Sequence, residues 1–354
     1  MDLDLSRDGV ALTAALVDIA SVSGEEKPLA DAIERALEAL PHLTVRRTGN
    51  TVVARTRLGR AERVVLAGHI DTVPHAANFP SQFDSERTIL SGVGTTDMKS
   101  GVAVQLRLAR EVTEPTRDVT YVFYDCEEVE AARNGLNLLS RSDPDQLAGD
   151  FAVLLEPSGG LVEGGCQGTM RAAVTVPGAR AHTARSWMGK NAIHAAGDVL
   201  DVLREWRPRR PVVDGIEYHE GLNAVFVSGG VAGNVVPDEC VVTVNYRFAP
   251  DKSPAQAEAY LRGLFRSWRV EIVDVAPGAR PGLSAPAAAA FLAAVGGTPR
   301  AKLGWTDVAR FAQLGIPAVN YGPGLPEIAH TPGEYVEAEA ITECEARLAS
   351  WLSS

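Results

Sequence analysis

Hydrophobic and polar positions in the first 160 residues form two alternating patterns. Short apolar runs bounded by turn residues predict buried strands at 63–67, 119–124 and 151–155. Helices are predicted at 27–40, before the first of these strands, and at 101–110, between the first two. Ser23 to Glu26 has the form of a capping box before the first helix. Strands that alternate with helices imply an α/β fold with a mixed, mostly parallel sheet and helices on both faces.

The pattern changes after about residue 168. Strands are predicted at 170–176, 223–227 and 240–248, and helices at 191–206 and 254–268. A join rich in Pro and Gly follows at 277–282. The alternation then resumes, with helices at 285–295, 307–314 and 337–352 and a strand at 318–321. We therefore predict one α/β domain, residues 1–169 and 281–354, interrupted by an inserted α+β domain at 170–280.

Composition and charge narrow the class of protein. The 354 residues are 45% hydrophobic and 22% charged, which is typical of a folded globular protein. The net charge of −11 argues against nucleic acid or an anionic membrane as the main partner, because both attract basic surfaces. The sequence shows no apolar run of membrane-spanning length and no signal-peptide pattern. Its four scattered cysteines form no Cys-x-x-Cys pair, so we expect reduced thiols in a cytoplasmic protein.

Several segments place metal-binding side chains at the ends of predicted strands or in nearby turns. In open α/β sheets, binding sites form beyond the carboxyl ends of the strands. The segments are Gly68–Pro74, Gly92–Gly101, Asp125–Glu128, Glu156–Ser158 and Ala329–Pro332. Together they supply two histidines and several carboxylates, which suffice for two metal ions if one carboxylate bridges them. Nitrogen and oxygen donors without a thiolate fit Zn²⁺ in an open, catalytic site.

Each segment alone also has a structural interpretation. His69 followed by Asp71 is typical either of a ligand that donates its second ring N–H to a carboxylate or of a buried histidine beside a turn. Asp97 is either a ligand or a helix N-cap; a phosphate loop is disfavoured because this carboxylate would repel phosphate. Glu127 and Glu128 belong either to a solvated turn or to a site. In a site, one would bind a metal while the other, pointing the opposite way, faces a water molecule.

The motifs resemble one known family along essentially the whole chain. The matching motifs are Gly-His-Ile-Asp-Thr-Val-Pro at 68–74, Gly-Thr-Thr-Asp-Met-Lys-Ser-Gly at 94–101, Cys-Glu-Glu at 126–128, Leu-Glu-Pro-Ser at 155–158 and the late His330. Their order and the inserted domain resemble the di-zinc aminoacylase and carboxypeptidase family. Within it, residues 165–169 and 181–194 are most similar to succinyl-diaminopimelate desuccinylases of the actinobacterial type. Val93 departs from the pattern, since many members carry Arg there.

The resemblance implies a zinc-peptidase-like catalytic domain and a lid and dimerisation domain at 170–280. It also implies two Zn²⁺ per subunit, with Co²⁺ as a substitute. The implied ligands are His69 and Glu156 on one ion, Glu128 and His330 on the other, and Asp97 as the bridge. Asp71 would orient His69, and Glu127 would act as general base and then general acid.

Residues of the inserted domain are expected to complete the site. The resemblance implies that His182 reaches into the active site of a partner subunit and donates to the oxyanion, whereas the residues alone favour a turn histidine. Substrate carboxylates require bidentate donors such as arginine. The candidates for substrate contacts are Arg171, Arg185, Asn234, Arg247 and, from the loop before His330, Gly324. For Arg247 a structural role in an edge strand is the alternative.

The expected activity is hydrolysis of an amide bond in a small anionic N-acyl amino acid. The resemblance implies removal of succinate from N-succinyl-LL-2,6-diaminopimelate, in lysine and cell-wall precursor synthesis, by a homodimer joined through the inserted domain. Acetylornithine deacetylation, or another aminoacylase or dipeptidase activity of the same family, is the nearest alternative. A metal-free binding or scaffold protein on the same fold is a different one, but a binding role alone would not need the complete ligand set.

Overall fold

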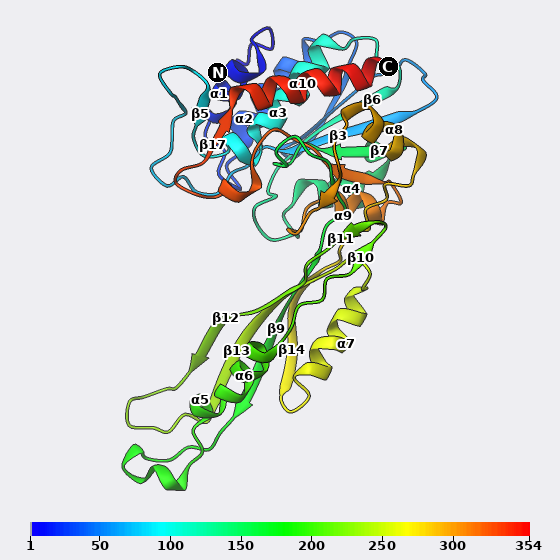
Figure 1. Ribbon diagram of the computed structural model, residues 1–354. Coiled ribbons are helices and arrows are strands. Elements are labelled where there is room, and N and C mark those ends of the chain that lie inside the picture. The colour runs from blue at the N-terminus through cyan, green and yellow to red at the C-terminus, as the bar shows by residue number, and fades with distance from the viewer. Residues whose placement is uncertain (1) are drawn as a thin grey trace. The chain divides into compact units, whose positions relative to one another are not determined.

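The computed structural model describes residues 2–354, which form two compact units (Figure 1). The first unit contains the chain up to Gly164 together with Pro281–Arg300 and Arg310–Ser354. The second unit contains Gly165–Arg280 and Ala301–Ala309. Each unit has its own buried apolar core.

The described part of the first unit is built on an eight-stranded sheet with the order β1-β2-β6-β3-β7-β16-β8-β15. The strands are β1 (Thr44–Thr48), β2 (Thr51–Arg55), β6 (Asp118–Tyr124), β3 (Arg63–His69), β7 (Phe151–Leu154), β16 (Ala318–Asn320), β8 (Glu163–Gly164) and β15 (Arg300–Ala301). The central strands β6, β3, β7 and β16 are parallel neighbours, and β2 and β8 join them antiparallel. The predicted mixed, mostly parallel sheet is therefore confirmed.

Helices pack on this sheet and bury its apolar side chains. They are α1 (Gly9–Val17), α2 (Lys27–Glu38), α3 (Ser100–Glu111), α4 (Gly135–Ser142), α8 (Pro286–Val295) and α10 (Ala338–Ser353), with α9 (Val308–Gln313) at the boundary between the units. Helix α3 packs against α1 and α10 (Figure 1) and is fully buried from Ser100 to Leu106. Burying each large apolar side chain contributes about 1.5–3 kcal/mol, so this helix firmly anchors the loop that precedes it. A small sheet, β17 (Tyr335–Glu337), β5 (Ile89–Ser91) and β4 (Gln82–Phe83), lies in the same unit.

The second unit contains an antiparallel sheet with the order β12-β13-β9-β14. The strands of this sheet are β12 (Gly221–Gly229), β13 (Glu239–Phe248), β9 (Gly168–Pro177) and β14 (Arg269–Ala276). The helices of the unit are α5 (Ala192–Ala195), α6 (Gly197–Glu205) and α7 (Pro254–Leu264). A separate pair of short strands joins β10 (Val212–Val213) to β11 (Ile216–Glu217). Burial alternates along β9 and β13, so one face of the sheet packs into the core and the other remains more exposed.

Several details differ from the sequence expectations, and three concern elements discussed above. The segment expected as one helix at 191–206 is two short helices, α5 and α6. Strand β14 was not predicted, because most of its residues are at least partly exposed and no clear apolar pattern marks it. The capping box at Ser23 is wrong: neither side chain caps α2, since Ser23 donates to Asp71 and Glu26 accepts from Gly24 and Cys126.

Candidate metal centre

The parallel strands bring three of the predicted segments to one edge of the sheet. His69 is the last residue of β3, Glu128 lies in the turn after β6, and Glu156 lies two residues beyond β7. Because β3 pairs with both β6 and β7, the carboxyl ends of all three strands are neighbours. The register pairs Ala67 with Leu154, so His69 and Glu156 each lie two residues beyond the last pair of these strands. Glu156 is buried, with 5% of its surface exposed.

Asp97 lies between the two histidines. Its Oδ1 is 3.1 Å from His69 Nε2, and its Oδ2 is 3.3 Å from His330 Nε2. The same His330 nitrogen lies 2.7 Å from Glu128 Oε1. One carboxylate that reaches a different imidazole with each oxygen has the arrangement that a bridging ligand requires. Lys99, and not Asp97, occupies the N-cap position of α3, and no side chain caps this helix.

The donor atoms of this cluster fit a metal site. Among the described residues, His69, Asp97 and Glu128 offer ligand atoms that all lie within 4.8 Å of one another; Glu156 is not part of this group. Imidazole nitrogens and carboxylate oxygens are suitable ligands for Zn²⁺ and related cations, and the group contains no thiolate. The arrangement can therefore hold a hydrolytic metal centre.

Charge in the cluster favours protonated histidines until a metal displaces the protons. Burial opposes protonation of His69, but hydrogen bonds and charges from Asp71 and Asp97 outweigh it and raise its pKa well above the ordinary value. Hydrogen bonds to Asp97 and Glu128 raise the pKa of His330 to about 10. Burial opposes ionisation of Asp97, but hydrogen bonds from the two histidines outweigh it and lower its pKa well below the ordinary value.

Similarity to known proteins identifies the family of this chain. The chain matches the model of peptidase family M20/M25/M40 over residues 65–354. The chain belongs to this family. A succinyl-diaminopimelate desuccinylase of Corynebacterium glutamicum is 45% identical over 364 residues, which cover 99% of this chain and 98% of that protein. A Mycobacterium tuberculosis H37Rv protein with the provisional name succinyl-diaminopimelate desuccinylase DapE is 54% identical over 343 residues, 96% of each chain.

Solved structures of the same fold include other M20 peptidases. A Staphylococcus aureus tripeptidase has a TM-score of 0.79 and 19% identity, and covers 99% of this chain and 98% of its own. The Bacillus subtilis YxeP protein, described as a dinuclear metal-binding peptidase of the M20 family, has a TM-score of 0.68 and 19% identity, with 97% and 96% covered. At such identities these structures establish the fold. Among residues 2–354, no helix has both the length and the apolar composition needed to cross a bilayer.

Asp71 contacts the turn after β6 as well as His69. His69 Nδ1 lies 3.1 Å from the Asp71 backbone oxygen and 3.4 Å from its Oδ1. The two carboxylate oxygens also accept the backbone N–H groups of Glu127, at 3.0 Å, and Glu128, at 3.1 Å. The side chain is fully buried and accepts a further hydrogen bond from the Ser23 hydroxyl at 2.7 Å. Asp71 thus fixes a histidine and the following glutamate turn with one carboxylate.

Two buried side chains that the sequence did not single out hold the Asp97 loop. Glu334 Oε1 accepts the backbone N–H groups of Thr96, at 3.0 Å, and Asp97, at 3.1 Å. Lys99 donates from Nζ to the backbone oxygens of Leu16, at 3.1 Å, and Ile19, at 2.9 Å. Glu334 lies four residues after His330, so the same segment carries His330 and supports the loop of Asp97.

We expect metal binding to release protons from the histidines. At pH 7.5 His330, with a pKa of about 10, is protonated in the metal-free protein, and the raised pKa of His69 favours its protonated form. A metal requires neutral imidazoles. Titration with Zn²⁺ should release about two protons per chain, and His330→Ala should release about one. Because protons compete with the metal, apparent affinity should fall as pH falls from 8 to 6. Calorimetry in buffers of different ionisation enthalpy measures the protons; release of none would contradict this electrostatic description.

Gly324 lies against the backbone of Thr96, in the loop that carries Asp97 (the bridging loop). A Cβ there would be 2.5 Å from the Thr96 backbone oxygen and 2.9 Å from its Cα. We therefore expect Gly324→Ala to displace Thr96 and Asp97 and to weaken metal binding by about tenfold or more, because misplacing a ligand loop is costly. Gly333→Ala, where a Cβ meets no atom within 4 Å, is the matched control. Equal metal affinity of the two variants would show that the loop tolerates the shift.

Proposed function

We propose that this chain hydrolyses N-succinyl-LL-2,6-diaminopimelate to succinate and LL-2,6-diaminopimelate with two Zn²⁺ per subunit. The contacts of Asp97 carry the proposal. One of its carboxylate oxygens lies near His69 and the other near His330, which is the arrangement expected of a ligand shared by two metal ions. Relatives that are named for this reaction are 45–54% identical to this chain over almost its whole length, and their names suggest the substrate. The proposed ligands are His69, Asp97, Glu128, Glu156 and His330.

Glu127 is the proposed general base and acid. Two Zn²⁺ ions, when bound, would lower the pKa of a water molecule towards about 7 and polarise the amide carbonyl. Glu127 takes a proton from the attacking water and delivers it to the leaving amine nitrogen. Its backbone N–H donates to the buried Asp71 carboxylate at 3.0 Å, which holds the backbone from which the Glu127 side chain extends. The turn directly after β6 thereby supplies both the base and the neighbouring ligand Glu128.

His182 is the proposed donor to the oxyanion. It precedes a short 3-10 helix, and its Nδ1 accepts the Ala184 N–H at 3.0 Å. A neutral imidazole that accepts at Nδ1 carries its proton on Nε2, which makes Nε2 a donor. The imidazole is exposed, and the Thr183 N–H donates to the Asn234 backbone oxygen at 3.1 Å. This tie supports Asn234 as a second substrate contact, with exposed Arg185 on the same segment as His182.

Arginines on the open face of the second unit's sheet are proposed to bind substrate carboxylates. In the register of β9 and β13, Arg171 faces Asn245 and Arg247 faces Thr169, so the two arginines lie on one face. Arg171 is paired with Asp274 at 3.3 Å. Arg247 is partly buried and forms no ion pair with another residue in 2–354. Arg247 is therefore the better supported of the two, and Gly324 is proposed to contact the substrate from the bridging-loop side.

A homodimer through the second unit is part of the proposal. Strand β12 ends the sheet order and exposes Val225, Phe226 and Val227, with 43%, 68% and 56% of their surfaces accessible. An apolar edge strand is a template for pairing with another chain, so a second copy is its natural partner.

A cytoplasmic location is also proposed. The four cysteines are free and buried, which supports it.

Direct product analysis tests the proposed reaction. Zinc-loaded protein incubated with N-succinyl-LL-2,6-diaminopimelate should release succinate and a free amine in equal amounts. A chelator should abolish the release, and added Zn²⁺ should restore it. Product formation that is unaffected by metal removal would contradict the dinuclear mechanism, whereas no product with metal bound would contradict the substrate.

A further inference from the structure

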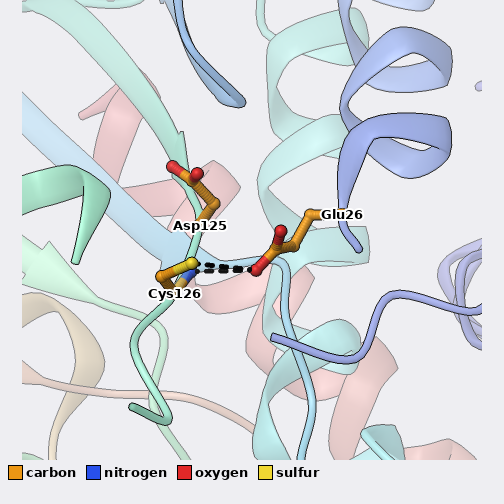
Figure 2. Close-up of side chains that lie close together, drawn as sticks. All are labelled: Glu26, Asp125 and Cys126. Atoms are coloured by element: carbon orange, nitrogen blue, oxygen red, sulfur yellow. Dashed lines mark hydrogen bonds between the residues drawn. The ribbon is translucent and has the colours of Figure 1, made fainter. Parts of the chain in front are cut away.

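We propose that Glu26 is a positioning residue that holds the turn carrying the general base, an inference that rests on the proposed function. Glu26 is fully buried at the start of α2. Its Oε1 accepts the Gly24 N–H at 2.6 Å. The same oxygen accepts the backbone N–H of Cys126 at 3.2 Å and its thiol at 3.3 Å (Figure 2). A residue 100 positions away in the sequence thus holds the residue immediately before Glu127.

The backbone of this turn adopts an unfavourable conformation that requires stabilising contacts. Cys126 has φ of 58°, in the left-handed region that residues with a Cβ rarely adopt. Three successive backbone N–H groups, those of Cys126, Glu127 and Glu128, end on buried carboxylates. Glu26 accepts the first and Asp71 accepts the other two. With all three amides bound, the backbone of the turn is held where Glu127 leaves it.

The segment from Ser23 to Glu26 connects these two carboxylates. Ser23 donates its hydroxyl to Asp71 Oδ2 at 2.7 Å, and its backbone N–H donates to the Thr72 backbone oxygen at 3.1 Å. Gly24 donates its backbone N–H to Glu26. The carboxylates that hold the catalytic turn are therefore supported by one short segment, which begins far from the turn in sequence.

A cation on the same side chains is the competing explanation. Glu26, Asp125 and Cys126 offer ligand atoms within 4.8 Å of one another. However, Glu26 Oε1 already accepts three hydrogen bonds, and Asp125 Oδ1 accepts the Thr51 hydroxyl at 2.8 Å. Figure 2 shows the Asp125 carboxylate directed away from the other two side chains. The hydrogen-bonding role accounts for the contacts that are present, and a bound cation is an outcome of the test.

Two conservative variants separate the position of the acceptor oxygen from its charge. Glu26→Gln keeps an oxygen at the Oε1 position and removes the charge. Glu26→Asp keeps the charge and withdraws the oxygen by one methylene. We expect kcat of the zinc enzyme to fall by about 10–100-fold in Glu26→Asp, because an error of about 1 Å in a catalytic group has an effect of this size. KM should change less than threefold, and Glu26→Gln should stay within about threefold of wild type for both constants.

A second measurement is independent of substrate and metal. The Cys126 amide should exchange its hydrogen at least about tenfold faster in metal-free Glu26→Asp than in wild type, because it has lost its acceptor. Glu26→Gln should exchange at the wild-type rate. Glu25→Asp, at the exposed neighbouring position, is the matched control for both measurements. Metal content and thermal unfolding confirm that each variant is folded and loaded.

The outcomes are distinct. Wild-type rates of turnover and exchange in Glu26→Asp would overturn the positioning role, as would an equal loss in Glu26→Gln, which would assign the effect to charge. A third Zn²⁺ in wild type that is lost in Glu26→Gln would show a cation site instead. A wild-type enzyme without activity on the succinylated substrate contradicts the proposed function, and the exchange rates then still decide the role of Glu26.

Discussion

Glu127→Gln should lower kcat for N-succinyl-LL-2,6-diaminopimelate by about 10³–10⁴-fold, at the upper end of what general acid–base catalysis contributes. Gln has the same shape but neither accepts a proton from water nor delivers one to the leaving amine. The backbone N–H at this position remains bound to Asp71, so the turn keeps its conformation. The variant should therefore bind metal as wild type does. Steady-state kinetics combined with metal analysis measures both quantities.

Glu130→Gln is the matched control for this experiment. Glu130 is exposed, lies three residues further along the same turn region and has no proposed role. The kcat of the Glu130→Gln variant should stay close to the wild-type value. If Glu127→Gln retains more than about a tenth of wild-type kcat with metal bound, Glu127 is not the general base.

His182→Ala should lower kcat by about 10²–10³-fold, the usual effect of removing one oxyanion donor. KM should change much less, because the donor acts on charge that develops in the transition state. Metal binding should be unaffected, since the imidazole is bound within the second unit and not to a proposed ligand. His194→Ala, an exposed histidine in α5, is the control and should retain wild-type kcat.

Hybrid dimers test whether His182 serves the partner's site. Equal amounts of His182→Ala and Glu127→Gln subunits should recover about a quarter of wild-type activity after subunit exchange. Half of the dimers are then hybrids, and in each hybrid one site has both groups. If His182 acts within its own subunit, no hybrid site is complete. Absence of recovery under confirmed exchange would therefore contradict the shared site.

The sequence predicted the sheet, and it predicted that candidate ligands meet at one edge of it, because His69, Glu128 and Glu156 follow strands with strong local patterns. The apolar runs that end at His69 and before Glu156 define parallel neighbours, so the meeting of their ends follows from topology. The contact of Asp97 with His330 could not be predicted from local pattern, because it depends on a segment more than 200 residues later in the chain. Family resemblance, rather than periodicity, suggested that pairing.

The sequence failed where a local motif served a distant site. Ser23 and Glu26 have the spacing of a capping box, yet both side chains support the turn after β6. Glu334 likewise has no pattern of its own, although its carboxylate holds the bridging loop. A carboxylate that accepts backbone N–H groups from another segment leaves no periodic signal, because its partners are main-chain atoms of any residue type.

The most direct test of the proposed activity is a comparison of kcat/KM for three kinds of substrate on the zinc-loaded enzyme. N-succinyl-LL-2,6-diaminopimelate, acetylornithine and a panel of dipeptides differ in the acyl group and in the number of carboxylates that the arginines would bind. We predict that the succinylated substrate exceeds every other by at least about 10²-fold, because unpaired buried polar groups penalise substrates that lack a partner. A higher kcat/KM for acetylornithine or a dipeptide would contradict the assignment.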